Sequence, residues 1–124
     1  MAQKILIVDD HPDAAKMLAI LLAREGYNTI HVQDGRTAFD LARKENPHLV
    51  LTDLQMPELS GVELVKLLRK EPQFDKLPII IVTAYRTAEF YEAMHAGAND
   101  VIFKPIFYDR LLTAIKKFLP DDQQ

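Results

Sequence analysis

The 124-residue chain contains no cysteine, which excludes disulfide bonds and thiol chemistry. This absence is compatible with an intracellular location, because disulfides persist mainly in oxidising compartments. Excess basic charge is lacking as well, since 18 acidic side chains outnumber 15 lysines and arginines and leave a net charge of −3. Domains that bind duplex nucleic acid usually carry a basic surface, so we expect no direct nucleic-acid binding by this domain.

Long hydrophobic runs are also missing. The apolar run that follows Lys4 is far shorter than a signal-peptide core or a membrane span of about 20 residues, so we expect no membrane association. The sequence has no repeats and no low-complexity segments. Its length fits one domain, which we place at residues 1–119, with residues 120–124 as a C-terminal tail or the start of a linker.

The sequence does contain a regular alternation of short apolar runs and helical patterns. Strands are predicted at residues 5–8, 29–32, 49–52, 79–82 and 101–103. Most of these runs are continuously apolar and often β-branched, as in parallel strands that are buried on both faces. The run at 29–32 alternates instead, which indicates an edge strand.

Residues that start and stop helices separate these runs. Pro12 suits a first helical position, and Gly26 suits the left-handed residue that ends the same helix. Asp34 can cap a second helix, and Ser60 with Glu63 forms a capping-box pattern for a third. The apolar faces predicted for the first, fourth and fifth helices contain Met17, Leu18, Leu21 and Leu22, then Phe90, Tyr91 and Met94, then Leu111, Leu112, Ile115, Phe118 and Leu119.

The alternation predicts an α/β fold of the (βα)5 type. Parallel strands joined by right-handed helical crossovers form a doubly wound, five-stranded sheet with helices on both faces. We expect the flavodoxin-like strand order 2-1-3-4-5. In open sheets of this kind the ligand site lies beyond the carboxyl ends of the strands, so those ends are the first place to look for function.

Polar residues follow the predicted strands at these ends. The first strand ends in Asp9-Asp10, the third in Asp53, the fourth in Thr83 and the fifth in Lys104. Two carboxylates about 4 Å apart repel by roughly 4 kcal/mol at an effective dielectric constant near 20, and a single lysine leaves the group under-neutralised. We therefore predict a Mg²⁺ site and, without metal, at least one carboxyl group with a raised pKa.

This residue set suits phosphoryl transfer. A carboxylate can attack a phosphoryl donor and become an acyl phosphate, and the reaction depends mainly on positioning and charge neutralisation. Asp53 is the predicted nucleophile because it ends the central strand, whereas Asp9 and Asp10 share one strand end, which suits metal binding. Each residue alone has an ordinary role as a cap or turn residue, so the prediction depends on their coincidence at four strand ends.

These motifs resemble those of the response-regulator receiver family of two-component signal transduction, which has a chemotaxis-regulator-like fold. The resemblance covers about residues 4–119. The motifs are the acidic opening at residues 5–10, the phosphoacceptor loop at residues 53–57 with Gly61, the hydroxyl switch Thr83-Ala84, and Lys104-Pro105.

The resemblance implies a cytoplasmic signalling domain that accepts a phosphoryl group on Asp53 and then changes its affinity for partners. Such a domain is no conventional enzyme, although it catalyses its own phosphorylation and slow autodephosphorylation. The resemblance also implies that Thr83 and Lys104 hold the phosphoryl group and that the Lys104-Pro105 bond is cis. The implied Mg²⁺ ligands are Asp10, Asp53 and the Gln55 backbone carbonyl, with Asp9 acting through water.

Three features depart from the family pattern. Val101 stands where the family often has a Tyr or Phe that is coupled to the hydroxyl switch, which puts a ring-based readout in doubt. Phe107 replaces the usual helix cap, so the last helix is predicted to begin near Tyr108. Gln55 and Tyr85 occupy the positions that flank the attacking water, which predicts an altered phosphoryl lifetime without fixing its direction.

The resemblance implies a histidine kinase or a histidine phosphotransfer domain as the phosphoryl donor. The downstream target or output domain is not identified by the sequence, and a phosphorylation-linked homodimer is left open. The residues expected on the donor contact face are His11, Pro12, Ala15, Ile20 and Phe107. The expected output surface is the fourth helix, the fifth strand and the fifth helix, with Phe90, Phe103 and Tyr108 partly exposed.

Other classes of function fit less well. A phosphatase with an aspartyl nucleophile commonly has a second Asp where this chain has Gln55, and a flavodoxin-like electron carrier needs a phosphate-binding loop where this chain has Asp9-Asp10. A receiver-like binding module that needs no phosphorylation remains an alternative, because of Val101. A histidine-based metal centre is not predicted, because His11, His31, His48 and His95 lack ligand spacing and are interpreted as surface or edge residues.

Overall fold

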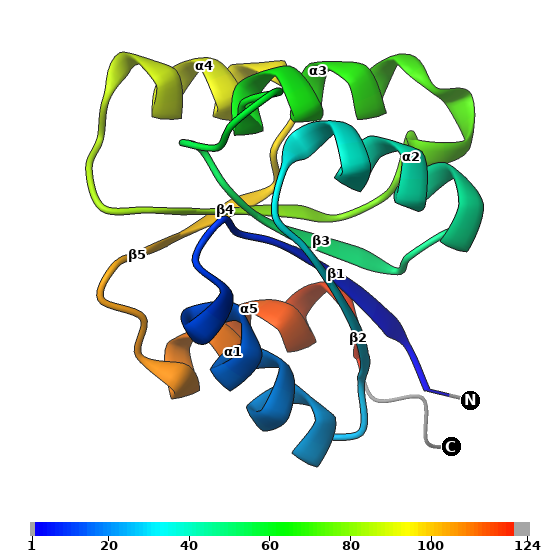
Figure 1. The fold of residues 1–124 in the computed structure, drawn as a ribbon, viewed down its shortest axis with the longest axis vertical. Helices are drawn as coiled ribbons and strands as arrows, with labels where there is room; N and C mark the ends of the chain where they lie inside the picture. The colour runs from blue at the N-terminus through cyan, green and yellow to red at the C-terminus, as the bar shows by residue number, and fades with distance from the viewer. Residues whose placement is uncertain (1, 121–124) are drawn as a thin grey trace.

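The computed structural model describes residues 2–120 as a five-stranded parallel sheet with helices on both faces (Figure 1). The strand order is β2-β1-β3-β4-β5, which confirms the predicted flavodoxin-like fold. The strands are β1 (Lys4–Val8), β2 (Asn28–Val32), β3 (Leu49–Asp53), β4 (Ile79–Thr83) and β5 (Asp100–Phe103). Residue 1 and most of the predicted tail, residues 121–124, lie outside the described residues.

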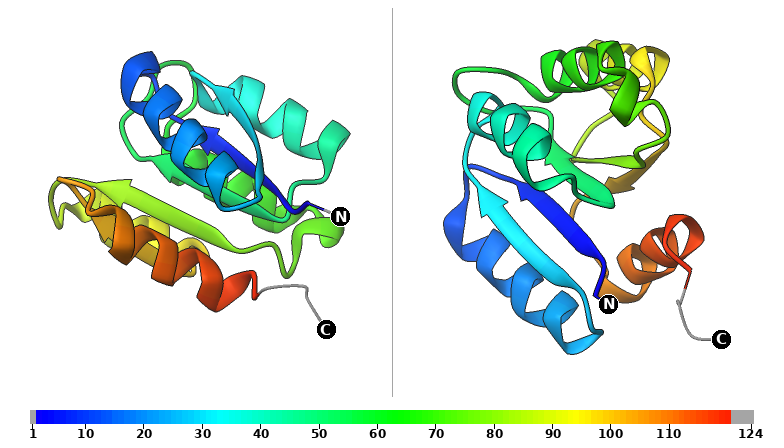
Figure 2. Two further views of the ribbon diagram at one scale, coloured as in Figure 1. Left: turned by 90° about the horizontal axis from the view of Figure 1, so that it is seen from below. Right: turned by 90° about the vertical axis from the view of Figure 1, so that its right-hand side faces the viewer.

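The helices form two layers. The helices are α1 (Pro12–Arg24), α2 (Gly35–Glu45), α3 (Gly61–Lys70), α4 (Ala88–Ala96) and α5 (Tyr108–Phe118), with a short 3-10 turn η1 (Pro72–Phe74) after α3. Helices α1 and α5 cover one face of the sheet, and α2, α3 and α4 cover the other, as the views in Figure 2 show. Within residues 2–120, no helix is long and apolar enough to cross a membrane.

Local sequence signals explain most helix ends. Pro12 is the first residue of α1, as predicted. The Asp34 side chain accepts a hydrogen bond from the Thr37 backbone N–H at the start of α2, and Ser60 with Glu63 forms the predicted capping box of α3. Helix α5 begins at Tyr108, and the Phe107 side chain before it caps no backbone N–H, as its apolar character requires.

The strands divide the core into two halves because successive side chains of a strand point to opposite faces. In β1, Ile5 and Ile7 pack towards α1 and α5, whereas Leu6 and Val8 pack towards α2, α3 and α4. All four side chains are almost fully buried, and burial stabilises the fold by about 1.5–3 kcal/mol for each of them. Parallel pairing of β1 with β3 then extends both halves across the sheet.

The predicted apolar face of α1 was partly wrong. Met17 is 57% exposed, while Ala15, Leu18 and Leu22 are the buried residues of this helix. The buried positions follow an i, i+3, i+7 pattern, and Met17 lies off that line. Leu21 is half-buried at the border of the same face.

A close backbone contact fixes the loop between β3 and α3. The Gly61 N–H donates a hydrogen bond of 2.9 Å to the Leu54 carbonyl oxygen. A Cβ atom on Gly61 would lie only 2.2 Å from the Asp53 carbonyl oxygen, so only glycine fits there without moving the loop. Glu58 in the same loop has a φ of 69°, which lets the chain turn back sharply towards α3.

We predict that Gly61→Ala destabilises the protein more than Gly26→Ala does. Gly61→Ala forces a steric clash with the β3 backbone, which costs about 2–3 kcal/mol by analogy with overpacked cores. Gly26 has a φ of 98°, but a Cβ atom added to it would meet no other atom within 4 Å, so its replacement costs about 1 kcal/mol from backbone strain alone. Urea unfolding of both variants measures the difference, and equal losses of stability would contradict the proposed clash.

Candidate functional site

The carboxyl ends of four strands bring the predicted site residues together. Asp53 ends β3 and Thr83 ends β4, while Asp9 directly follows β1 and Lys104 directly follows β5. The strand register aligns these ends, because Val8 pairs with Thr52, Asp53 with Val82, and Thr83 with Phe103. The Lys104 backbone N–H donates to the Thr83 carbonyl oxygen at 2.8 Å and extends the ladder by one residue.

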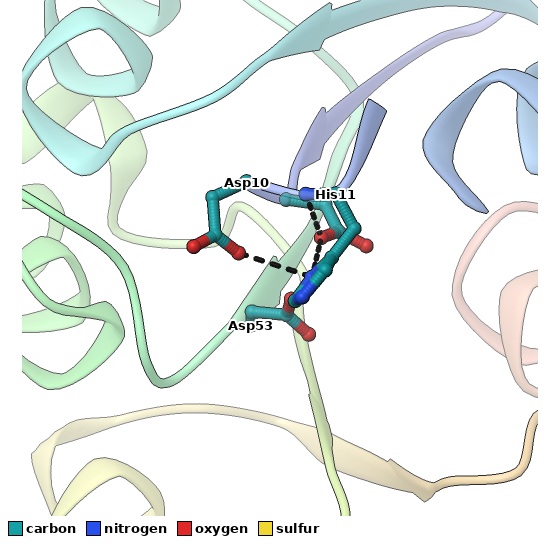
Figure 3. Close-up of side chains that lie close together, drawn as sticks. Asp10, His11 and Asp53 are labelled. Atoms are coloured by element: carbon teal, nitrogen blue, oxygen red, sulfur yellow. Dashed lines mark hydrogen bonds and ion pairs between the residues drawn. The ribbon is translucent and has the colours of Figure 1, made fainter. Parts of the chain in front are cut away.

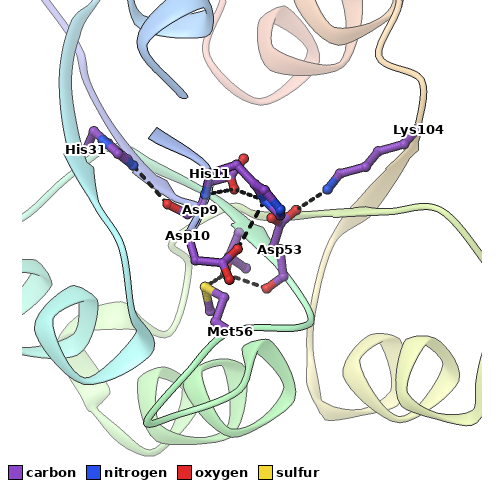
Figure 4. Close-up of polar contacts among 8 residues, drawn as sticks. Asp9, Asp10, His11, His31, Asp53, Met56 and Lys104 are labelled. Carbon is purple, nitrogen blue, oxygen red and sulfur yellow. Dashed lines mark hydrogen bonds and ion pairs between the residues drawn. The ribbon is translucent and has the colours of Figure 1, made fainter. Parts of the chain in front are cut away.

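The acidic residues form one cluster with a lysine beside it. One ligand atom each from Asp9, Asp10, His11 and Asp53 lies within 4.8 Å of all the others. The Lys104 Nζ atom is 3.2 Å from Asp53 Oδ1 and approaches Asp53 from the side away from Asp10 (Figure 4). Asp9 is only 7% exposed and Asp53 only 4%. Two carboxylates are thus buried beside one ammonium group.

Burial raises the pKa of Asp53 to about 7, from an ordinary 3.8. Hydrogen bonding to the Asp9 side chain and repulsion by its charge raise the pKa further, whereas the charge of Lys104 and its hydrogen bond lower it. Burial and the neighbouring carboxylate therefore outweigh the lysine. The raised carboxyl pKa predicted for this cluster is confirmed.

His11 joins the cluster from the start of α1. Its backbone N–H donates to Asp9 Oδ1 at 2.8 Å, and its imidazole Nδ1 lies 3.1 Å from both Asp9 Oδ1 and Asp10 Oδ1 (Figure 3). The side chain is 68% exposed, so the predicted surface position is confirmed. The contact of His11 with the two carboxylates was not predicted, because the four histidines lack metal-ligand spacing; the position of His11 directly after the two aspartates was the available signal.

The cluster is chemically suited to a divalent cation. Its negative charge exceeds what Lys104 neutralises, and carboxylate oxygens are the ligands that Mg²⁺ prefers. Asp10 Oδ1 is buried and has no hydrogen-bond partner in the described part of the chain, despite the nearby imidazole. A buried acceptor without a donor is costly, and a bound cation would satisfy it.

A cavity opens beside the buried carboxylate. Its volume is about 210 Å³, and its lining includes Asp53, Gln55, Thr83, Tyr85 and Lys104. The Gln55 side chain donates a hydrogen bond to the Glu89 carboxylate in the first turn of α4. The carboxylate of Asp53, the ammonium group of Lys104 and the hydroxyl of Thr83 therefore line the same cavity.

Aromatic residues of α4 and β5 pack together near the site. Phe103 packs on Phe90 with ring centroids 5.6 Å apart, and the Arg86 guanidinium lies 4.6 Å from the Phe103 centroid. Phe90 is only 4% exposed, so its predicted partial exposure was wrong. Phe103 and Tyr108 are half-exposed, as predicted.

The Lys104-Pro105 bond is cis, as the resemblance implied.

Comparison with known proteins identifies the family. Residues 5–116 match the response regulator receiver domain. The polar-differentiation response regulator DivK of Brucella ovis is 36% identical over 122 residues, which cover 98% of this chain and 99% of DivK. The chain therefore belongs to the response regulator receiver family of two-component systems.

Solved structures agree with this assignment. A putative response regulator from Chloroflexus aurantiacus has a TM-score of 0.91 at 30% identity, covering 98% of this chain and 100% of its own. The chemotaxis response regulator CheY4 of Vibrio cholerae has a TM-score of 0.89 at 29% identity, with 95% and 99% covered. The receiver domain of a Pseudomonas aeruginosa sensor histidine kinase has a TM-score of 0.89 at 26% identity, with 98% and 100% covered. That domain was solved with a magnesium ion coordinated in its active site cleft.

We predict that Asp53→Asn stabilises the metal-free protein at high pH but not at low pH. Folding raises the pKa of Asp53 from 3.8 to about 7, so the folded state binds a proton more tightly and wild-type stability falls as pH rises between these values. Asparagine resembles the protonated carboxyl and avoids this loss. We expect the variant to be about 1–3 kcal/mol more stable at pH 8, with little difference below pH 4.

Urea unfolding in the presence of a chelator, at pH values from 4 to 8, measures this effect. Asp13→Asn is a suitable control, because Asp13 is an exposed carboxylate in the first turn of α1. A difference between Asp53→Asn and wild type that stays constant with pH would contradict the prediction.

Proposed function

We propose that the chain is a phosphorylation-dependent switch in which Asp53 is the phosphoacceptor. The observation that carries the proposal is the position of the Asp53 carboxylate, which is buried, lies 3.2 Å from Lys104 Nζ and borders the cavity. One Asp53 oxygen attacks phosphorus, the bond from phosphorus to the donor's imidazole nitrogen breaks, and its electron pair stays on that nitrogen. The product is an acyl phosphate on Asp53.

The chain's own residues position and neutralise the reacting group. The ammonium group of Lys104 neutralises the negative charge on one phosphoryl oxygen. The Thr83 hydroxyl, which lines the same cavity, donates a hydrogen bond to another phosphoryl oxygen. Asp9, Asp10, Asp53 and the Gln55 backbone carbonyl would hold Mg²⁺, with Asp9 acting through water. The bound cation would supply charge neutralisation for the phosphoryl oxygens and would favour the ionised, nucleophilic form of Asp53.

Loss of the phosphoryl group depends on water reaching the same cavity. Tyr85 and Gln55 lie in its wall, and Tyr85 is 74% exposed. Gln55 also donates a hydrogen bond to the Glu89 carboxylate, which favours one position of its side chain beside the cavity. We therefore propose that the phosphorylated protein loses its phosphoryl group slowly. We also propose that the protein is a cytoplasmic signalling domain and not an enzyme that turns over a substrate.

We predict that one phosphate is added to the wild type by a small-molecule phosphodonor in a Mg²⁺-dependent reaction. Asp53→Asn removes the nucleophile and should take up none, whereas Asp40→Asn, at an exposed position of α2, should behave as wild type. Intact-mass measurement with and without Mg²⁺ tests this. Binding of beryllofluoride distinguishes rapid hydrolysis from a lack of phosphorylation. If the wild type forms no adduct and binds no beryllofluoride, the protein is a binding module that needs no phosphorylation.

The phosphoryl donor is proposed to be a histidine kinase or a histidine phosphotransfer domain that docks beside α1. Met17, Ile20 and Phe107 are 57%, 46% and 56% exposed, respectively. A groove of about 430 Å³ runs from Asp9 and Lys104 along this side and is lined largely by apolar side chains of α1 and by Pro105, Ile106 and Tyr108. Exposed apolar groups of this kind mark protein contacts. Ala15, predicted on this face, is fully buried and takes no part in it.

We predict that Met17→Ser combined with Ile20→Ser slows phosphoryl transfer from a phosphohistidine protein at least tenfold. Loss of two apolar contacts at the centre of an interface typically costs more than about 1.4 kcal/mol, which corresponds to tenfold in affinity. The rate with a small-molecule phosphodonor should not change, because neither residue belongs to the acidic cluster. Tyr91→Ser is a matched control, because Tyr91 is 56% exposed on α4. Equal slowing by the control, or of both donors, would exclude this docking face.

A further inference from the structure

His11 brings an imidazole nitrogen into the carboxylate cluster at the start of α1. Its Nδ1 atom is 3.1 Å from Asp9 Oδ1 and 3.1 Å from Asp10 Oδ1. Figure 3 shows the ring beside Asp10 and Asp53, and Figure 4 shows Asp9 beside it as well. Adjacent ligands of an octahedral ion with bonds of about 2.1 Å lie about 3 Å apart. The 3.1 Å between His11 Nδ1 and Asp10 Oδ1, the buried oxygen without a hydrogen-bond partner in the described part of the chain, is therefore a spacing that two neighbouring ligands of one metal ion can adopt.

The main chain of His11 is fixed at the start of α1, and the imidazole contacts the two carboxylates from there. His11 precedes Pro12, and a residue before proline is restricted to extended backbone conformations. The observed φ of −105° and ψ of 96° fit that restriction. The 2.8 Å hydrogen bond from the His11 N–H to Asp9 Oδ1 closes the turn between β1 and α1. The backbone freedom of His11 is therefore already lost before the nitrogen binds a cation.

A second histidine, His31, lies near the cluster but outside the set of possible metal ligands. The His31 Nε2 atom lies 2.9 Å from the Asp9 backbone carbonyl oxygen, and its ring approaches from β2, away from the carboxylates (Figure 4). Within residues 2–120, the donor cluster contains His11 but not His31. The two imidazoles therefore differ in position, although both are close to Asp9.

We propose that His11 Nδ1 is a ligand of the cation held by Asp10 and Asp53, with Asp9 acting through water, and that it extends the site's preference from Mg²⁺ to borderline divalent cations such as Co²⁺ and Zn²⁺. This inference rests on the proposed function, because it concerns the same cation site. Carboxylates bind hard cations such as Mg²⁺, whereas imidazole binds borderline transition metals well. A site with one imidazole among its carboxylates discriminates less in favour of Mg²⁺ than an all-oxygen site does.

Titration of the full chain with Co²⁺ and with Mg²⁺ tests the proposal. His11→Gln should weaken Co²⁺ binding at least tenfold, because a borderline cation loses its nitrogen ligand, and should change Mg²⁺ binding less than about twofold. The visible absorption of bound Co²⁺, which reports ligand type, should differ between His11→Gln and wild type. His31→Gln is the matched control and should alter neither metal's affinity nor the spectrum.

The outcomes separate this inference from the proposed function. The role of His11 would be overturned if His11→Gln left the Co²⁺ spectrum unchanged and either weakened the binding of both metals equally or did not weaken Co²⁺ binding. The Mg²⁺ site of the wild type would remain in either case. Failure of the wild type to bind either metal would overturn the cation site itself, and with it the proposed function. Unchanged Mg²⁺ binding by His11→Gln also shows that the variant is folded, as the 68% exposure of this side chain leads us to expect.

Discussion

The repulsion between buried carboxylates at the end of the sheet is the constraint on which the rest of the structure depends. Asp9 and Asp53 are almost fully buried, and Lys104 approaches only one of them. The parallel strands hold these groups together at the cost of local stability, because at high pH one carboxyl must ionise beside another. A ligand that binds only the folded state and neutralises this charge stabilises the whole domain. Stability and site occupancy are thereby coupled.

The same site is connected to α4 through the loop after β3. Gly61 lets this loop pass against the Asp53 carbonyl, and Gln55 in the loop bonds to Glu89 of α4. Because Val101 has no ring, a ring-based readout at that position is not available. Arg86, in the loop after Thr83, covers Phe103 instead. Two connections therefore lead from the surroundings of Asp53 to α4. One is the Gln55–Glu89 hydrogen bond, and the other is the loop between β4 and α4.

The fold and most of the site geometry could be predicted from the sequence because parallel strands bring their carboxyl ends to one edge. Placing Asp9, Asp53 and Lys104 required only the strand ends and their order. The orientation of helices was harder to predict. Apolar residues of α1 occur almost all round the helix, so the sequence does not fix which face is buried, and both Met17 and Ala15 were misplaced. The contact of His11 depends on a turn whose direction no periodicity reports.

The constraints on stability and reactivity act in opposite directions at Asp53. With its pKa near 7 in the absence of a cation, Asp53 is largely protonated in mildly acidic solution, and a protonated carboxyl is a poor nucleophile. A cation that stabilises the ionised form makes the residue reactive and at the same time removes the repulsion that destabilises the fold. The affinity and identity of that cation therefore control both properties together. In the proposed function, the ligand set around Asp10 consequently sets the conditions under which the domain is both stable and able to accept a phosphoryl group.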